Sequence, residues 1–349
     1  MDAPPAPLSN YPVPIETLTF STAQPVYLAE GAANVVYAIN PPLNSDYGIP
    51  SLLRLRKALP TTLPIPLAHQ LHTTYIRPLF KAEQLVEQQL VCLAQDVIPT
   101  LNEGLQVNEA SGIRLAKRRG VYLEGKERFG LLVRDMRALK DGDVTVEFKP
   151  KWLAHSPTMP EGSTRCRNCA LRAQRATLKL KEGREANGGG SGEHEAFCPL
   201  NLVVEDLSRR RKVVKAVMAN SRVSERDWER VERRLMDWLG DRGQLLMRRL
   251  RQVQIAHDPG GVLRLDGKEG QKMGVRIAMT VRECTVFVRI PAEEGKAIEA
   301  RLGDLDVKDA GKLASWKDVE RKLIDDRWYL GRELPKGSKE VECALSTRK

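Results

Sequence analysis

The sequence predicts an α+β fold of two lobes, a strand-rich N-lobe followed by a larger, mixed α/β C-lobe. Short segments of alternating apolar residues crowd the start of the chain, whereas apolar residues at helical spacing dominate its second half. The 349 residues, 42% of them hydrophobic, are enough to form two cores. We expect the N-lobe over residues 1–138 and the C-lobe over residues 139–349.

The N-lobe is expected to consist mainly of strands. Its strand candidates are Pro25–Leu28, Val35–Ile39, Ser51–Arg56 and Leu131–Val133. A turn of small residues joins the first two, and the stretch from Glu83 to Val97 has the spacing expected of a helix.

The C-lobe is expected to begin with a strand that starts near Asp143 and ends within the segment Val146–Trp152, and to be mostly helical after it. The polar, glycine-rich stretch from Lys181 to Glu195 predicts a flexible loop. Ser224 and Ser315 each precede a run of apolar residues at helical spacing, so we expect a capped helix after each. Between these helices Thr285–Ile290 predicts a strand, and Met273–Val281 fits either a strand or a helix.

The chain is strongly basic, with a formal net charge of +11 and a pI near 9.4. Such a charge attracts polyanions: nucleic acid, an anionic membrane or a highly phosphorylated small molecule. Solvated helix faces would explain part of the excess. No run of about 18 apolar residues is present, so we expect no membrane span. The amino terminus lacks the basic and apolar regions of a signal peptide, so we expect a soluble intracellular protein of the nucleus or cytoplasm.

Two lysines flank a proline in the segment Glu147-Phe148-Lys149-Pro150-Lys151. Because side chains alternate along a strand, Glu147, Lys149 and Lys151 would share one face of it. Pro150 removes a donor from the ladder and marks the end of the strand. A phosphate ligand would satisfy both lysines, and an exposed edge with a local salt bridge is the alternative.

Two other segments are candidates for binding phosphate or a metal. The turn Glu30–Asn34 lets backbone amides approach a phosphate, although most such turns are plain hairpins, and Arg54 could reach the same group. Asp304 and Asp306 would face the same way, as carboxylates that hold Mg²⁺ beside phosphates do. Two lysines and an aromatic residue then recur every four residues, either as a binding face or as a solvated face of a helix: Lys308, Lys312 and Trp316.

Six cysteines are too few for a disulfide scaffold in a chain of this length. Their spacing gives C-x-x-C followed by H-x-x-x-C, a candidate set of zinc ligands: Cys166, Cys169, His194 and Cys198. His155 is an alternative fourth ligand. Ordinary buried thiols are the competing interpretation, and we expect the remaining cysteines to be such thiols: Cys92, Cys284 and Cys343.

Seven blocks of the chain, taken in order, resemble the inositol-pentakisphosphate 2-kinase family, whose members complete inositol hexakisphosphate (phytate). They span roughly residues 27 to 330, and E-x-K-P-K with the two cysteine motifs behind it is the specific part. The blocks are Gly31–Val36, Leu53–Lys57, Glu147–Lys151, Cys166–Cys169, Cys198–Leu202, Arg282–Thr285 and Asp304–Lys308.

The resemblance implies a bilobal, kinase-like fold and an ATP-dependent kinase that phosphorylates the 2-hydroxyl of inositol pentakisphosphate. The hinge would fall around Arg134–Met136, and Arg54 would replace the strand lysine that holds nucleotide phosphates. Nucleotide contacts would come from Gly31, Ala32, Ala33, Asn34, Arg54, Asp135 and Glu147. Asp304 would bind Mg²⁺, and Lys149 would bridge the transferred phosphate and the inositide. Further substrate contacts would come from Lys151, Arg175, Asn220, Arg222, Lys308, Lys312, Trp316 and Arg119, or Arg118 in its place.

The chain departs from the family at several of these positions. The family's Asp-Cys-Ser is Glu283-Cys284-Thr285 here, and the resemblance implies that Glu283 activates the 2-hydroxyl. Lys312 and Trp316 stand where arginine and tyrosine are common. We expect a monomeric kinase with no nucleic-acid or membrane partner. The alternatives are a basic, zinc-containing nucleic-acid-binding protein and a kinase-like scaffold that binds inositol hexakisphosphate without turnover.

Overall fold

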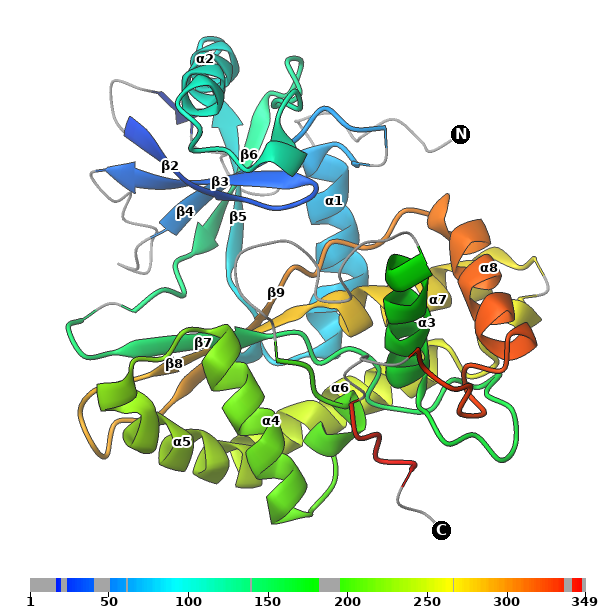
Figure 1. Cartoon of the computed structure of the whole chain (residues 1–349). Helices are drawn as coiled ribbons and strands as arrows, with labels where there is room; N and C mark the ends of the chain where they lie inside the picture. The colour runs from blue at the N-terminus through cyan, green and yellow to red at the C-terminus, as the bar shows by residue number, and fades with distance from the viewer. Residues whose placement is uncertain are drawn as a thin grey trace. The chain divides into compact units, whose positions relative to one another are not determined.

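The chain divides into two compact units, Met1–Asp135 and Met136–Lys349, each described here by itself (Figure 1). The structure is a computed structural model that describes residues 17–19, 24–40, 51–60, 62–138, 140–181, 195–265, 267–335 and 341–346. Both units contain helices and strands, so the predicted α+β class is confirmed. None of the helices in these ranges is long and apolar enough to cross a membrane.

The first unit is built on a sheet of six strands in the order β1-β5-β6-β4-β3-β2. All its pairs are antiparallel except β1 with β5. The strands are β1 (Thr17–Leu18), β2 (Gln24–Glu30), β3 (Asn34–Asn40), β4 (Ser51–Arg56), β5 (Gln88–Leu93) and β6 (Phe129–Arg134). The four strands predicted in this region are therefore confirmed as β2, β3, β4 and β6.

Helix α2 (Val97–Ala110) packs against this sheet through its buried apolar side chains: Val97, Ile98, Leu101 and Leu105. Helix α1 (Ile65–Leu71) has Pro66 in its first turn, where the amide that proline lacks would have no partner within the helix. Short turns complete the unit: His72–Ile76, Arg77–Leu79, Ala82–Gln84 and Ala116–Arg118.

The predicted helix over Glu83–Val97 is wrong. The centre of that stretch is β5, which pairs with β6 and β1, and the helix begins only at Val97. The segment's apolar residues fit helical spacing, but Leu90, Val91 and Leu93 belong to the core of the sheet. Tertiary pairing decided the outcome, because a short apolar run fits either type of element.

The second unit contains a three-stranded antiparallel sheet, β7 (Val144–Phe148), β8 (Thr285–Ile290) and β9 (Glu299–Gly303), in that order. Helices α4 (Leu207–Asn220), α5 (Glu225–Gly240), α6 (Arg242–His257) and α7 (Glu269–Glu283) pack one on the next, and α4 also contacts β7 (Figure 1). Helix α3 (Arg167–Lys181) packs on α8 (Lys312–Asp325). Short turns lie at Pro199–Leu202 and Val262–Arg264.

Several elements that the sequence predicts in the second unit are confirmed. Strand β8 and the helix after Ser224 are confirmed, and Met273–Val281 is helical, within α7. The predicted helix start at Ser315 is wrong, because α8 begins at Lys312, where Gly311 and Asp309 turn the chain into the helix. Lys308 lies before the helix, so the predicted helical face of Lys308, Lys312 and Trp316 is wrong for its first member. The predicted flexible loop falls mostly outside the described residues.

Candidate functional site

Lys149 is the centre of a hydrogen-bonded group at one end of the β7-β8-β9 sheet. Its Nζ donates to the carbonyl of Glu283 at 3.0 Å, to Thr285 Oγ1 at 2.9 Å and to Asp304 Oδ2 at 3.1 Å. Thr285 donates in turn to the same Asp304 oxygen at 2.5 Å. Strand register explains the meeting, because Thr285 lies opposite Gly303, the residue before Asp304, and Phe148 lies opposite Val286.

Lys151 turns away from the strand and pairs with Glu283. Its Nζ lies 2.8 Å from Glu283 Oε2, and both side chains are partly exposed. Lys151 has φ +54°, a left-handed conformation that ends the alternation expected along β7. Asp304 and Arg222 share this rare conformation, with φ +56° and +53°. Strained backbone of this kind concentrates at functional sites. Among the described residues other than glycine, four have positive φ, and three of these four are residues that the sequence picks out.

Electrostatic coupling extends this group to more of the predicted residues. Burial and then the negative charge of Asp304 raise the pKa of Glu147 above its usual range, which places two carboxylates near each other. Burial is also the main cause that lowers the pKa of Lys308; Glu283 opposes that shift and Lys312 adds to it. Lys308 therefore lies within electrostatic reach of Glu283 and Lys312.

The turn after α4 lies beside β7. The backbone amide of Glu147 donates to Ser221 Oγ at 3.1 Å, so the predicted residues Asn220 and Arg222 flank a direct contact to the strand. The Asn220 side chain is engaged with the backbone of Glu195, through two hydrogen bonds of 2.8 Å. Arg222 and Arg175, the latter in α3, are exposed.

In the first unit, the loop between β2 and β3 is held by a buried ionic group. Glu30 pairs with Lys57 at 2.5 Å and with Arg114 at 2.9 Å, and all three side chains are almost fully buried. Lys57 also donates from Nζ to the Gly31 carbonyl and from its backbone amide to the Ala33 carbonyl. Burial raises the pKa of Glu30, but hydrogen bonds from Arg114 and Lys57 outweigh this effect and lower the pKa below its usual range. The contacts of Lys57 and Glu30 therefore hold the loop Gly31–Asn34 in place.

The other predicted residues of this unit lie at separate places. Arg54 is buried in the middle of β4, and its charge contributes, after burial, to lowering the pKa of His69. Arg119 is exposed, with Nε 3.5 Å from the carbonyl of Arg114. Asp135 is buried at the end of the unit.

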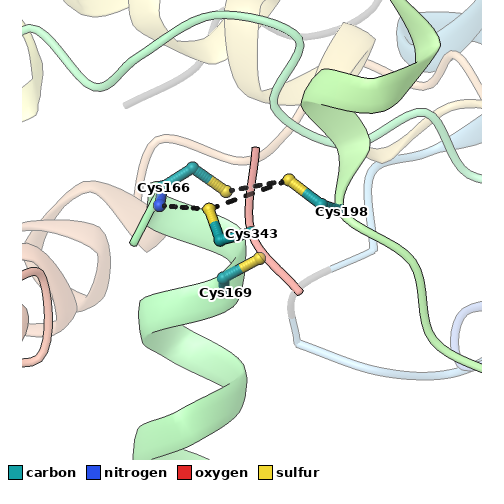
Figure 2. A group of neighbouring side chains, drawn as sticks. All are labelled: Cys166, Cys169, Cys198 and Cys343. Atoms are coloured by element: carbon teal, nitrogen blue, oxygen red, sulfur yellow. Dashed lines mark hydrogen bonds between the residues drawn. The ribbon is translucent and has the colours of Figure 1, made fainter. Parts of the chain in front are cut away.

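Four cysteine sulfurs converge in the second unit, from α3, the turn after residue 195 and the carboxyl-terminal segment (Figure 2). Cys166, Cys169, Cys198 and Cys343 are buried, and their sulfurs lie within 4.8 Å of one another. Two of the separations are 3.7 and 3.9 Å. A tetrahedral site with bonds of about 2.3 Å has sulfur–sulfur edges of about 3.8 Å, so the group fits a tetrahedral metal.

This cluster, found among the described residues, differs in one member from the predicted ligand set. Three expected cysteines are present, but the fourth sulfur is that of Cys343, which the sequence indicated to be an ordinary thiol. Spacing gave no signal, because Cys343 lies far along the chain. His155, the alternative ligand, lies outside this group among the described residues, and His194 is not described. Cys284 fits the ordinary-thiol prediction, since burial raises its pKa to about 12.

The arrangement defines an α+β protein with a cluster of lysines and carboxylates suited to a phosphorylated ligand and a separate four-sulfur centre. The family model for inositol-pentakisphosphate 2-kinase matches residues 27–322. The chain belongs to the inositol-pentakisphosphate 2-kinase family. It is similar to the inositol-pentakisphosphate 2-kinase of Yarrowia lipolytica, 27% identical over 186 residues. That match covers 53% of this chain and 53% of the relative, so the chain spans about half the length of the curated relative that it matches.

Sequence reasoning missed several side chains that complete these sites. Thr285 stands in a recognised block, yet its bridge between Lys149 and Asp304 depends on strand register. Lys57 follows the predicted Arg54 in the same block, and only the fold shows that its side chain reaches the Gly31 carbonyl.

Proposed function

We propose that the protein is an ATP-dependent kinase that phosphorylates the 2-hydroxyl of inositol pentakisphosphate and releases inositol hexakisphosphate. The observation that carries this proposal is the position of Lys149, whose ammonium contacts Asp304 and Thr285 beside the Lys151–Glu283 pair. Phosphoryl transfer depends on positioning and charge neutralisation more than on covalent chemistry by the protein. The cluster of lysines beside the carboxylates of Asp304 and Glu283 can position a phosphorylated substrate and neutralise its charge.

Each residue has a distinct role in this proposal. Lys149 contacts the transferred phosphoryl group, and Lys151, Lys308 and Lys312 hold phosphates of the inositide. The carboxylate of Glu283 accepts the hydrogen bond of the 2-hydroxyl and takes up its proton as the new bond to phosphorus forms. Trp316 and the exposed arginines extend the substrate site: Arg175, Arg222 and Arg119. Asn220 orders the turn that carries Arg222.

The nucleotide contacts that the resemblance implies are proposed for each unit by itself. Gly31–Asn34 offers backbone amides on a loop that Lys57 and Glu30 hold in place. Arg54 and Asp135 of the first unit and Glu147 of the second are the remaining candidates. Asp304 is the proposed Mg²⁺ ligand: after burial, its negative charge raises the pKa of Glu147, and a divalent cation relieves the repulsion between the two carboxylates. When bound, ATP–Mg²⁺ supplies the phosphoryl group and neutralises its charge.

The four-cysteine centre is proposed to hold a structural Zn²⁺. Four thiolates are a closed ligand set, which leaves no position for substrate or water. The metal would join α3 to the carboxyl-terminal segment that carries Cys343.

The test is transfer of phosphate from ATP to inositol pentakisphosphate, measured for the parent protein and Lys149→Ala. We expect transfer by the parent and a loss of at least about 10²-fold in the variant, with an unchanged melting temperature, because one transition-state contact is removed. A parent protein without transfer, or a variant as active as the parent, would contradict the proposal. Stabilisation by duplex DNA, with none by the inositide and ATP–Mg²⁺, would favour the nucleic-acid-binding alternative.

A further inference from the structure

Trp152, the residue after Lys151, lies buried against two guanidinium groups. The Cζ atom of Arg282 is 3.4 Å from the centre of the indole ring, and that of Arg167 is 4.3 Å away. Only 5% of Trp152 and 1% of Arg282 are exposed. Attraction between a cation and an aromatic face is strongest where water is excluded, so these contacts are substantial.

Each of the two guanidinium groups is held in place by a buried carboxylate. Arg282 donates to Asp258 Oδ2 at 2.7 Å, and both side chains are buried. Arg167 donates to Glu320 Oε2 at 2.8 Å. Glu320 also accepts hydrogen bonds from three hydroxyl groups: Ser156, Thr158 and Tyr329. The ring therefore rests on cations that cannot move independently of the core.

Both residues of the Trp152–Arg282 contact are sequence neighbours of residues in the proposed active site. Trp152 directly follows Lys151 and Arg282 directly precedes Glu283, so the stacked pair lies one residue behind the 2.8 Å ion pair. Gln254, fully buried, fixes the backbone on both sides of the ring: it donates to the Lys151 carbonyl and accepts from the Leu153 amide. This clamp holds Lys151 in its left-handed conformation.

The same ring reaches the helix that carries other proposed substrate contacts. Trp152 forms a cluster with Val275 and Met279, and Leu313 and Trp316 of α8 pack against this cluster. Arg167 and Glu320 further join the start of α3 to α8. A displacement of the indole would therefore shift Lys151, Glu283 and Trp316 together.

We propose that Trp152 is a positioning residue, whose contact with Arg282 sets the separation and direction of Lys151 and Glu283 toward the inositide. This inference rests on the proposed function, since it assigns Trp152 to the same site. Trp152 has apolar neighbours as well, Val275 and Met279, but its aromatic ring also contacts two buried cations, which packing alone does not require.

Trp152→Met tests the role, because it keeps a large apolar side chain and removes the aromatic face. We expect kcat/KM for the inositide to fall roughly 10- to 100-fold, as small misplacements of reacting groups do, while KM for ATP stays within about twofold. Trp152→Phe should recover most of the loss. Trp238→Met is the matched control, a buried tryptophan of α5, and should lower the melting temperature without lowering kcat/KM.

A double-mutant cycle with Lys151→Met separates positioning from general packing. Because part of the effect of Trp152 acts through Lys151, adding Trp152→Met to Lys151→Met should lower kcat/KM by a clearly smaller factor than adding it to the parent, while the part that acts through Glu283 remains. The same loss in both backgrounds would overturn the proposal. Should Trp152→Met not fold, fluorinated tryptophans placed at position 152 alone keep the shape and weaken the ring's attraction for cations. kcat/KM should then fall with each added fluorine, and a constant value would overturn the proposal.

Failure of the inference about Trp152 can be distinguished from failure of the proposed kinase function. A parent protein that transfers no phosphate contradicts the kinase proposal directly. Calorimetry with inositol pentakisphosphate alone still reads the placement of Lys151 in such a protein, and Trp152→Met should weaken binding about tenfold through the misplaced lysine. Unchanged affinity, or no binding by the parent, would overturn the inference.

Discussion

The Nζ atom of Lys151 and Oε2 of Glu283 lie 2.8 Å apart, which joins the E-x-K-P-K segment to the end of α7. Glu283 stands where the resemblance leads one to expect aspartate, and its longer side chain reaches the lysine. The Glu283 carbonyl accepts from Lys149 as well, so this one residue contacts both lysines of the segment. Both members of the ion pair are partly exposed and accessible to a ligand.

Glu283→Gln should lower kcat by about 10²-fold, because the amide cannot take up the proton of the hydroxyl. Inositide affinity should change little, since Lys151 remains free to bind a phosphate, and calorimetry would measure it beside initial rates. Glu293→Gln is the control, an exposed glutamate paired with Lys296. Turnover like that of the parent would show that Glu283 has another role.

Asp304→Asn should impair the use of Mg²⁺. The variant keeps the size and the hydrogen bond to Lys149 but loses the charge that a hard cation requires. We expect a sharp fall in turnover, partly restored at high Mg²⁺ concentration, while inositide binding without ATP is retained. Asp318→Asn in α8, which removes an exposed pair with Lys322, is the control. Equal loss of inositide binding and turnover would place Asp304 in the inositide site instead.

The candidate site residues and the elements around them leave different signals in the sequence. Short motifs carry their chemistry in consecutive residues, so Glu147, Lys149 and Lys151 were recognisable before any fold was known. Side chains that meet through strand pairing or from distant segments, such as Thr285 and Cys343, left no local pattern.

Element errors have a physical cause too. The sequence favours a helix at β5 because apolar residues in a short run fit the helical and the strand period equally well. Pairing with β1 and β6 makes the segment a strand. The start of α8 was misplaced because Ser315 resembles a capping residue, whereas the chain turns earlier, at Asp309 and Gly311. Polar residues with a capping preference occur inside helices as well.

Lys308 should make inositide binding sensitive to alkaline pH. Burial lowers its pKa, so Lys308 loses its proton at a lower pH than an ordinary lysine and then no longer attracts phosphate. Affinity should therefore decline as the pH rises through this lowered pKa, measured by calorimetry between about pH 7 and pH 10. Lys308→Arg, which stays charged, should hold its affinity to higher pH. Lys322→Arg, an exposed pair partner in α8, should leave the profile unchanged.

Cys343→Ser should remove the metal and destabilise the second unit. We expect about one zinc per chain in the parent by mass spectrometry and little in the variant, since a tetrahedral site needs all four ligands. Loss of a buried metal site belongs to the largest single-residue effects, roughly 3 kcal/mol or more. Cys92→Ser, in β5 of the first unit, is the control and should keep the metal. A metal-free parent, or zinc retained in Cys343→Ser, would refute the site.

Lys57→Met should loosen the loop between β2 and β3. The change removes one of the two cations that pair with buried Glu30, Arg114 being the other, and deprives the Gly31 carbonyl of the Lys57 ammonium. Breaking a buried pair in this way costs about 3 to 5 kcal/mol. We expect a lower melting temperature and a raised KM for ATP, with inositide affinity unchanged. Arg56→Met, the neighbouring residue paired with Glu127, should lower stability without raising KM for ATP.

The pH dependence of Lys57→Met gives an independent check on the same group. The pKa of Glu30 is lowered in the folded protein, so its contribution to stability is complete above the ordinary glutamate pKa and is lost as the pH falls through the lowered value. Without Lys57, one of the interactions that lower this pKa is gone, so the folded-state pKa rises toward or above the unfolded one. Acid unfolding of the variant should therefore begin at a higher pH than that of the parent, followed by circular dichroism. Arg56→Met leaves all contacts of Glu30 in place and should not show this specific shift. An acid transition at the same pH in Lys57→Met and the parent would mean that Lys57 does not stabilise the Glu30 carboxylate.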